Sequence, residues 1–413
     1  MIEERELEEK IISYYTRLID HDYGGVYGRV DHEQNVYKRV PKVMFQQCRY
    51  LWFFSEMGQK QSADDLFRFI SDHGIDKEHG GLYWSLSYMG KEMENDSKDA
   101  LCQATAILAF VSYGEITQAL SLFHLLEDKF FDGTGYKESL DRSFSKVLSS
   151  YRLVSSLLHI IESYTELFKK TEQSEVRRVL ERDITLIHDL FYQKEGVVLH
   201  DLLDGKNSAM NVPRSYGHEM ECFHIVDKAC EAIGMPLPAW TLDLYQSCLQ
   251  HGLFKDHIIY SVKKREAVHW VEAEAVIAAI HAYARTKETK YIDLAKTLLD
   301  FIQHNLIMKD GEGEWYYDDT GNPKDIVSLW KGPYNNTSMY QTIKETNELH
   351  LRDASPHQCG EQVREIRTGR VYQGLQGLWF HGNRRHRPFL QWQLRHRPTP
   401  SVEGTGEPVH ARV

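Results

Sequence analysis

Cysteine is scarce in this sequence, and its six residues form no disulfide or metal-binding pattern. They are scattered along 413 residues, and no two of them make a CxxC pair. In a chain of this length that distribution is typical of reduced cytoplasmic thiols, and it argues against a disulfide framework or a zinc site. The six are Cys48, Cys102, Cys222, Cys230, Cys248 and Cys359.

Long apolar runs and a surplus of positive charge are absent as well. No run approaches the roughly 18 apolar residues of a membrane span, so we expect no contact with a membrane. The first residues, 1–6, are mostly charged and lack the apolar core of a signal peptide, which predicts a cytoplasmic protein. A formal net charge of −11 argues against nucleic-acid binding. With 42% hydrophobic residues the chain can bury a sizeable core.

The sequence does contain a repeat built on glycine turns. Each turn is followed by an aromatic or aliphatic residue, as in Gly24-Gly25-Val26-Tyr27. Successive turns are 56, 55, 61, 56 and 61 residues apart, and a near-constant period over six units is typical of repeat architectures. The marker glycines are Gly24, Gly80, Gly135, Gly196, Gly252 and Gly313.

Between the glycine turns, apolar residues recur with helical spacing. Leu157, Ile160, Ile161 and Tyr164 lie on one helix face. Each period has room for two helices of about 12–18 residues and a short β-turn segment. The sequence therefore predicts an all-α fold of six helical hairpins closed into an (α/α)6 barrel. An open solenoid is the alternative, but no polar capping repeat is visible.

The composition changes near the C-terminus. Lys344 is the last lysine, whereas arginine continues to Arg412, and residues 398–413 are rich in Gly, Pro and Thr. We therefore expect a barrel domain over residues 1–350 and an Arg-rich, disordered extension over residues 351–413. A reading-frame change late in the gene is a second explanation, which the neighbouring nucleotide sequence would test.

The stretch Ser215–Glu221 carries the main chemical signal. Ser215 suits a helix N-cap, and Gly217 would allow a tight turn just before the helix. His218 and Glu221 are three residues apart, so they share a helix face and suit a general base tuned by an acid. The same residues also fit a plain helix start with an acidic first turn. His218 and His224 are six residues apart on different faces, so we expect no metal site.

Six blocks, in order between residues 10 and 345, resemble the N-acylglucosamine 2-epimerase superfamily, most closely its cellobiose 2-epimerase branch. The family fold is an (α/α)6 barrel, the architecture that the repeat predicts independently. The resemblance implies epimerisation at C2 of a reducing sugar, either a mono- or a disaccharide. It implies that the reaction needs neither a metal nor a nicotinamide cofactor. It also implies that the protein is a monomer or a homodimer. The blocks are Arg49–Ser55, Leu158–Thr165, Ser215–Glu221, Trp270–Glu274, Gly313–Tyr316 and Trp330–Tyr334.

The resemblance also implies roles for individual residues. The family removes the proton beside the aldehyde carbon with one histidine and returns a proton from the opposite face with another, and His218 matches one of them. Glu221 matches the carboxylate beside it, and His159 matches a histidine that contacts the sugar or assists ring opening. Arg49 matches a cation that hydrogen-bonds the developing enediolate oxygen. Residues implied to contact the sugar are Trp270, Trp330, His269, Glu274 and Asn335.

Three positions depart from the family pattern. Asn335 stands where the second catalytic histidine is expected, and asparagine cannot exchange a proton near neutral pH. Leu101 stands in place of a tyrosine, and His269 replaces the first tryptophan of a Trp-Trp pair.

Four functions therefore remain open from the sequence. The first, which we expect, is a C2 epimerase or isomerase in which another group, such as His269, supplies the second proton. The second is one-base aldose–ketose isomerisation by His218. The third is a sugar-binding protein that has lost catalysis. The fourth is a glycoside hydrolase with a carboxylate pair drawn from Glu162, Glu221 and Glu272.

Overall fold

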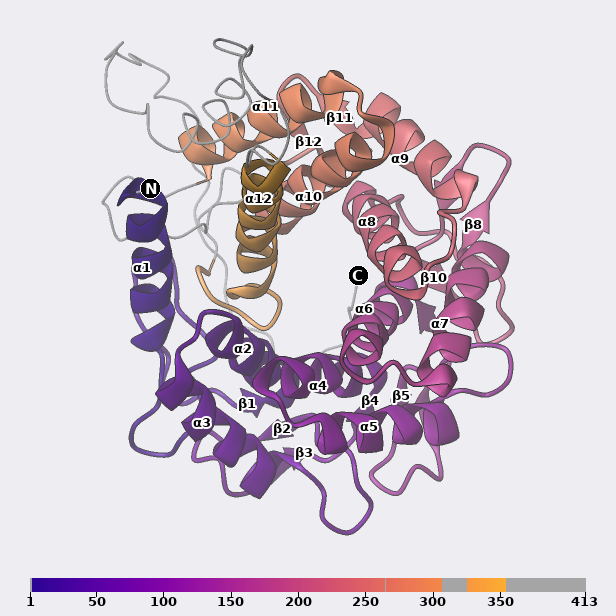
Figure 1. Cartoon of the computed structure of the whole chain (residues 1–413). Coiled ribbons are helices and arrows are strands. Elements are labelled where there is room, and N and C mark those ends of the chain that lie inside the picture. The colour runs from indigo at the N-terminus through magenta and orange to yellow at the C-terminus, as the bar shows by residue number, and fades with distance from the viewer. Residues whose placement is uncertain (1, 264, 307–324, 354–413) are drawn as a thin grey trace, which may run out of the picture. The chain divides into compact units, whose positions relative to one another are not determined.

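The predicted ring of helical hairpins is present in a computed structural model of the chain, which describes residues 2–263, 265–306 and 325–353. Six inner helices follow one another around the ring, and the last packs back on the first (Figure 1). The ring is therefore closed, as a barrel requires, and the open solenoid is excluded. The inner helices are α2 (Met44–Glu56), α4 (Ala100–Tyr113), α6 (Val154–Thr171), α8 (Tyr216–Ile233), α10 (His269–Thr286) and α12 (Tyr334–Asp353).

Outer helices surround this ring, and most of them pack on the inner helix that precedes them in the chain. α1 instead packs on the helix that follows it, since the Tyr15 ring lies 5.6 Å from Tyr50 and 5.3 Å from Phe53 of α2. The outer helices are α1 (Ile2–Thr16), α3 (Lys60–Phe69), α5 (Ile116–Leu125), α7 (Ser174–Leu186), α9 (Ala239–Gly252) and α11 (Thr289–Asn305). Three of them continue into π-helical turns that the sequence did not predict: η1 (Ile70–Gly74), η2 (Leu126–Phe130) and η3 (Ile187–Phe191).

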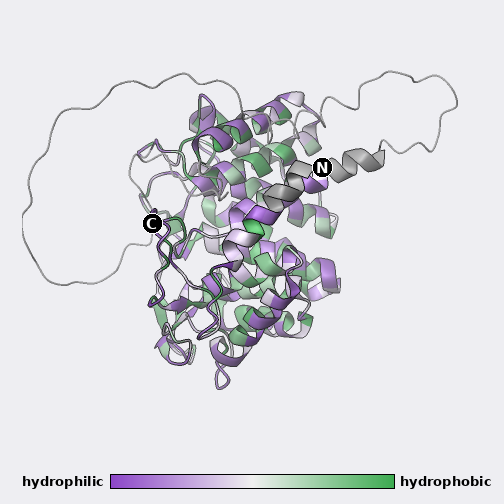
Figure 2. Cartoon of the chain, turned by 90° about the vertical axis from the view of Figure 1, so that its left-hand side faces the viewer, coloured by the Kyte–Doolittle hydropathy of each residue, from purple (hydrophilic) through white to green (hydrophobic). Residues whose placement is uncertain are grey.

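The two layers differ in how much of each helix is buried. In the inner helix α4 every residue from Ala100 to Val111 is buried. In the outer helix α7 the buried residues recur every three to four positions, for example Val176, Leu180 and Ile184. Figure 2 shows hydrophobic and hydrophilic residues alternating along the helices. The apolar stripe of an outer helix therefore covers an inner helix, while its polar face meets solvent.

Short antiparallel strands connect the hairpins. Two three-stranded sheets have the orders β1-β2-β3 and β4-β5-β6, and the remaining strands pair as β7 with β10, β8 with β9, and β11 with β12. In the first sheet Lys42 lies opposite Leu86, and Val43 opposite Ser85. The strands are β1 (Lys42–Val43), β2 (Ser85–Leu86), β3 (Met93–Asn95), β4 (Lys98–Asp99), β5 (Ser139–Leu140), β6 (Val147–Ser149), β7 (Arg152–Leu153), β8 (Tyr192–Gln193), β9 (Val198–Leu199), β10 (Leu202–Leu203), β11 (Leu253–Phe254) and β12 (His257–Ile258).

The glycine markers occupy equivalent positions between outer and inner helices. Gly24, Gly80 and Gly196 adopt positive φ angles of 77°, 79° and 92°, a region that favours glycine. In the third repeat Gly133, and not the predicted Gly135, takes the positive φ. Gly252 ends α9, and Gly313 lies outside the described residues.

The fourth residue of four inner helices fixes the strand that follows the glycine turn. Gln47 accepts a hydrogen bond from Val26 N at 2.8 Å and donates one to Val26 O at 3.1 Å. Equivalent bonds to backbone N–H groups are made by Gln103, Glu219 and Glu272. These side chains satisfy buried backbone groups, so the repeat is held by polar contacts as well as by apolar packing.

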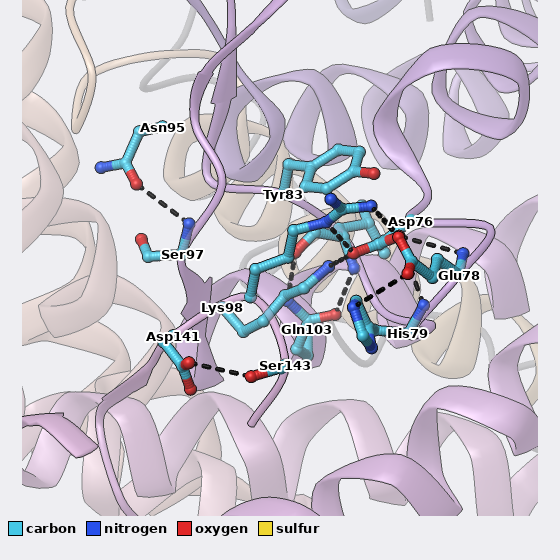
Figure 3. Close-up of polar contacts among 12 residues, drawn as sticks. Asp76, Glu78, His79, Tyr83, Asn95, Ser97, Lys98, Gln103, Asp141 and Ser143 are labelled. Atoms are coloured by element: carbon cyan, nitrogen blue, oxygen red, sulfur yellow. Dashed lines mark hydrogen bonds and ion pairs between the residues drawn. The ribbon is translucent and has the colours of Figure 1, made fainter. Parts of the chain in front are cut away.

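Ion pairs also hold the first three glycine turns, and the first two of these pairs are buried. In each, a cation two residues before the inner helix meets the aspartate at the start of the turn. Figure 3 shows Lys98 and Asp76 meeting beside Tyr83. The nitrogen–oxygen distances are 2.6 Å for Lys42–Asp20, 3.1 Å for Lys98–Asp76 and 2.7 Å for Arg152–Asp132.

Two of these pairs predict different losses of stability. Asp76 also forms an ion pair with Arg142, whose Nε lies 2.9 Å from Asp76 Oδ2. In the described part of the chain, by contrast, Lys42 is the one cation paired with Asp20. Lys42→Met should therefore leave an uncompensated buried carboxylate and cost about 3–5 kcal/mol of unfolding free energy. Lys98→Met should cost less, because Arg142 stays. Urea unfolding compares the two, and equal losses would contradict this account.

Several features noted in the sequence can now be placed. The five described cysteines are buried and unbridged, and Cys359 lies outside the described residues. The expected extension falls outside them too, apart from residues 351–353 at the end of α12. No described helix is long and apolar enough to cross a membrane.

Candidate active site

The first turn of α8 is built as predicted at its cap but not at its glycine. The Ser215 side chain accepts a hydrogen bond from His218 N at 3.4 Å, so Ser215 is the N-cap. Gly217 does not precede the helix but lies within it. A Cβ atom there would lie 2.4 Å from the Trp270 ring and 2.9 Å from Val271, so glycine is required by the close approach of Trp270.

Gly217→Ala is therefore expected to displace Trp270, whose ring lies 5.2 Å from the His218 ring. Overpacking should cost about 1–3 kcal/mol of unfolding free energy. A matched control is Gly74→Ala, which is overpacked at a different place. Its Cβ would lie 2.5 Å from Met44 Sδ. Chemical unfolding and turnover should separate the two variants, because only Gly217→Ala should also lower turnover per folded molecule. Equal turnover in both would refute the packing role.

His218 is held by a loop carboxylate and not by the predicted Glu221. Its Nδ1 lies 3.1 Å from Asp201 Oδ1, in the segment between β9 and β10. Burial lowers the pKa of His218, but the negative charges of Asp201, Glu221 and Glu274 outweigh it and raise the pKa to about 9. The imidazole is therefore protonated at neutral pH. Glu221 contributes charge, while its nearest partner is another histidine.

That histidine is His159, which lies at the centre of a second cluster. Its Nδ1 is 3.0 Å from Glu162 Oε2, and its Nε2 is 3.6 Å from Glu221 Oε1. Tyr334 OH donates to the other oxygen of Glu162. Burial raises the pKa of Glu221, although His159 opposes that shift. The cluster thus joins α6, α8 and α12.

Arg49 closes this cluster from α2. Its Nη2 lies 3.4 Å from His159 Nε2, and its guanidinium lies between the rings of Phe45 and Tyr334, at 4.3 and 4.5 Å from their centres. Burial lowers the pKa of Arg49, while Tyr334 and Glu221 act in the opposite direction. An arginine held between two rings in this way is fixed in orientation, with its charge directed at the carboxylates.

A third group surrounds Glu274 on α10. Asn335 Nδ2 donates to Glu274 Oε1 at 2.8 Å, and His224 Nε2 lies 2.5 Å from Glu274 Oε2. All three side chains are buried. The position of the expected second histidine is therefore linked through one carboxylate to a histidine on α8.

Repetition explains why these groups converge. Arg49, His159, Glu221 and Glu274 are each the sixth residue of their own inner helix. Equivalent positions of helices packed side by side in a closed ring face the same axis at the same height. The barrel thus gathers charged side chains from four repeats into one layer.

The remaining residues predicted to contact the sugar differ in exposure and in the side chains beside them. Trp270 lies against His218, as described above, and its ring is 6.2 Å from Tyr260. Trp330 is 45% exposed and its ring lies 5.2 Å from Phe45, beside Arg49. His269 is buried at the first position of α10, and Leu101 is buried on α4.

A cavity of about 310 Å³ opens beside Asp201. It is lined by residues 198–201 and 209–214, the two segments that flank β10 and precede α8. Asp201 therefore lies between this cavity and the His218 ring, which places the imidazole–carboxylate pair at the edge of the buried clusters.

Sequence and structure comparisons point the same way as this geometry. The sequence profile of the N-acylglucosamine 2-epimerase (GlcNAc 2-epimerase) family matches residues 25–341. The chain belongs to this family. Cellobiose 2-epimerase of Ruminococcus albus is 30% identical over 376 residues, which cover 82% of this chain and 96% of that protein.

Solved structures of similar proteins share the fold. Cellobiose 2-epimerase from Bacillus thermoamylovorans superposes with a TM-score of 0.77 at 25% identity, covering 84% of this chain and 98% of that one. A D-mannose isomerase superposes with a TM-score of 0.74 at 16% identity, over 83% of this chain and 97% of that one, which shows the common fold alone. The (α/α)6 prediction is thus confirmed.

Glu272, one of the three carboxylates considered for a glycoside hydrolase, has a structural role in this epimerase-family barrel. Both oxygens of Glu272 accept from Ile258 N, at 3.0 and 3.2 Å, and the side chain is fully buried. Glu272 is therefore one of the fourth-position residues that hold a strand, and it is not available as an acid or base. The described residues also contain no group of three or more His, Cys, Asp or Glu side chains that could hold a metal ion.

Sequence reasoning missed Asp201 and His224. Asp201 lies 17 residues before His218, and only the pairing of β7 with β10 brings its segment back to the inner helices. For His224 the sequence predicts only that it forms no metal site with His218. A signal for it did exist: Glu221 and His224 are three residues apart and, like His159 and Glu162, occupy the sixth and ninth helical positions.

Proposed function

We propose that this epimerase-family protein moves a proton at C2 of a reducing sugar through an enediolate, giving the C2 epimer. The observation that carries the proposal is the pairing of His218 with Asp201 at the edge of the layer formed by Arg49, His159 and Glu221. An imidazole that can release and accept a proton, beside a fixed cation, is what enediolate chemistry needs.

The chemistry assigns a role to each cluster. The C2–H bond breaks, its electrons form the C1–C2 double bond, and the carbonyl oxygen takes the negative charge. Arg49 stabilises that charge, since it presents fixed donors in a buried layer. His159, paired with Glu162, assists opening of the sugar ring by proton transfer to the ring oxygen. His218 exchanges the proton at C2.

The named activities of the relatives support the substrate class. The similar curated proteins include cellobiose 2-epimerases and, at 23% identity, a D-mannose isomerase from Pseudomonas cannabina. Both substrate names denote reducing sugars. We therefore place the substrate of this chain among mono- and disaccharides with a free aldehyde carbon.

Incubation of the protein with mannose, cellobiose and N-acetylmannosamine in D₂O tests this proposal. Proton NMR should show loss of the C2 proton signal and the appearance of the C2 epimer carrying deuterium. Formation of a ketose with deuterium at C1 would instead indicate aldose–ketose isomerisation at the same site. Absence of exchange with every sugar in the panel would remove the proposal.

A sugar-binding protein without catalysis is the second candidate, and Asn335 favours it. Its amide is already bonded to Glu274 and cannot carry a proton as the family histidine does. Calorimetric titration separates the two functions, because this candidate requires a sugar of the panel to bind while its C2 proton stays unexchanged in D₂O.

A further inference from the structure

A buried histidine stands close to the position where the family histidine is missing. His224 lies on α8, and its Nε2 reaches the same carboxylate that Asn335 holds. His224 is 5% exposed, Glu274 2% and Asn335 7%. The imidazole that position 335 lacks is therefore one carboxylate away, on a neighbouring inner helix.

This arrangement differs from an ordinary structural histidine. The other ring nitrogen of His224, Nδ1, is buried and has no hydrogen-bond partner among the described residues. Buried histidines that only support a fold usually have both nitrogens satisfied. The His224 ring is also 5.9 Å from His281, whose Nδ1 lies 2.7 Å from Asp227. Two imidazoles thus lie behind Glu274, and only one of them contacts it.

We infer that Glu274, backed by His224, is the second proton-transfer group of this protein and takes the place of the histidine expected at position 335. The inference rests on the proposed C2 chemistry. A carboxylate can serve as the base beside a carbonyl group, and it returns the proton as the carboxylic acid. Asn335 fixes one oxygen of Glu274, and His224 is a positioning residue that sets its charge.

The proton balance is closed without another reactant. In one direction the C2 proton passes to Glu274, the electrons form the enediolate, and protonated His218 delivers a proton to C2 from the other side. His218 ends neutral and the Glu274–His224 pair ends with one proton more. The reverse reaction restores the first state, and exchange with water also resets it.

The positions of these residues along their helices agree with proton transfer by His218 and Glu274 and with a supporting role for His224. His218 is the third residue of α8, Glu274 the sixth of α10 and His224 the ninth of α8. At about 1.5 Å rise per residue, His224 lies roughly 9 Å deeper along α8 than His218. Glu274 is therefore intermediate in depth, between the His218 level and the buried imidazole that supports it.

Two single variants and one control test the inference by product configuration. His224→Gln and Glu274→Gln should each lower C2 epimer formation at least about 100-fold. With the epimer whose C2 proton faces His218, both variants should still exchange that proton in D₂O with retained configuration, and this exchange should fall far less than epimer formation. His257→Gln is the control, since His257 is a similarly buried histidine on β12 against Phe301.

A rescue experiment, in which a second substitution restores epimer formation, is the more specific test. Adding Asn335→His to His224→Gln places an imidazole at the position of the family histidine, and it should restore epimer formation by at least tenfold over His224→Gln alone. A purely structural role for His224 would lower epimerisation and retained-configuration exchange together, and Asn335→His would not restore either. Thermal unfolding of each variant confirms that the proteins compared are folded.

The outcomes separate this inference from the proposed function. Epimerisation by the unaltered protein that persists in both His224→Gln and Glu274→Gln would overturn the inference and leave the function intact. Loss of all C2 exchange in the folded Glu274→Gln variant would also overturn it, since His218 alone should still exchange the proton. No C2 exchange by the unaltered protein with any sugar of the panel would remove the function itself.

Discussion

His218→Ala should lower formation of the C2 epimer by about 10²–10⁴-fold, the usual contribution of a positioned acid–base group. The imidazole is the group closest to the edge of the buried clusters, with a 23% exposed side chain, and Asp201 fixes its Nδ1. Alanine removes the imidazole that carries the proton, and Asp201 loses its partner Nδ1. NMR in D₂O measures the loss directly, with the substrate that reacts fastest in the panel.

Asp201→Asn gives the matching pH prediction. The raised pKa of His218, about 9, means that one required proton is present below this pH and is lost above it. For the epimer whose C2 proton passes to Glu274, protonated His218 is the acid, so kcat/KM of the unaltered protein should fall as the pH rises through about 9. Removing the Asp201 charge lowers the pKa, so the alkaline limb should move to lower pH. Because sugars also epimerise in alkali, each point needs an enzyme-free control.

An unchanged alkaline limb in Asp201→Asn would contradict the role of Asp201. Retention of more than a tenth of the epimerisation rate in folded His218→Ala would contradict the role of His218. His188→Ala is a suitable control, because His188 is a surface histidine on η3 whose nearest carboxylate is Asp189.

Arg49→Met should be the second most damaging change, with a loss of about 10²–10³-fold in kcat. The guanidinium is fixed between Phe45 and Tyr334 and directs its charge into the layer of Glu221 and His159. Methionine keeps most of the volume but cannot stabilise the enediolate oxygen. Because that charge develops only during the reaction, we expect kcat to fall much more than KM rises.

Arg49→Lys refines this test. Lysine keeps the charge but loses the planar fork that lies between two rings, so it should recover only part of the activity. Arg285→Met is the control, since Arg285 is more than a third exposed at the other end of α10, on Asp227. A kcat of Arg49→Met within threefold of the unaltered protein would show that Arg49 only packs and does not stabilise charge.

The sequence predicted the repeat and several of its contacts because these depend on local spacing. The glycine period gave six hairpins, and Ser215 marked the start of α8. The ion pairs of the glycine turns are also encoded locally: Lys42, Lys98 and Arg152 each stand two residues before an inner helix, but this regularity becomes visible only when the helix starts are known.

The parts that could not be predicted are long-range. Asp201 reaches His218 only because β10 pairs with β7 of the preceding hairpin. Gly217 looked like a turn residue, whereas its small size is required by a tryptophan 53 residues later. His224 and Asn335 meet at Glu274 only after the barrel closes. Each of these contacts depends on the arrangement of whole helices and not on neighbouring residues.

The most direct test of the central claim is a time course of C2 deuteration by the unaltered protein and by His218→Ala, side by side in D₂O. The account predicts deuterium at C2 of the epimer formed by the unaltered protein and almost no deuterated epimer with the variant. Equal amounts of deuterated epimer in both, or epimer formation without deuterium at C2, would contradict proton transfer by His218.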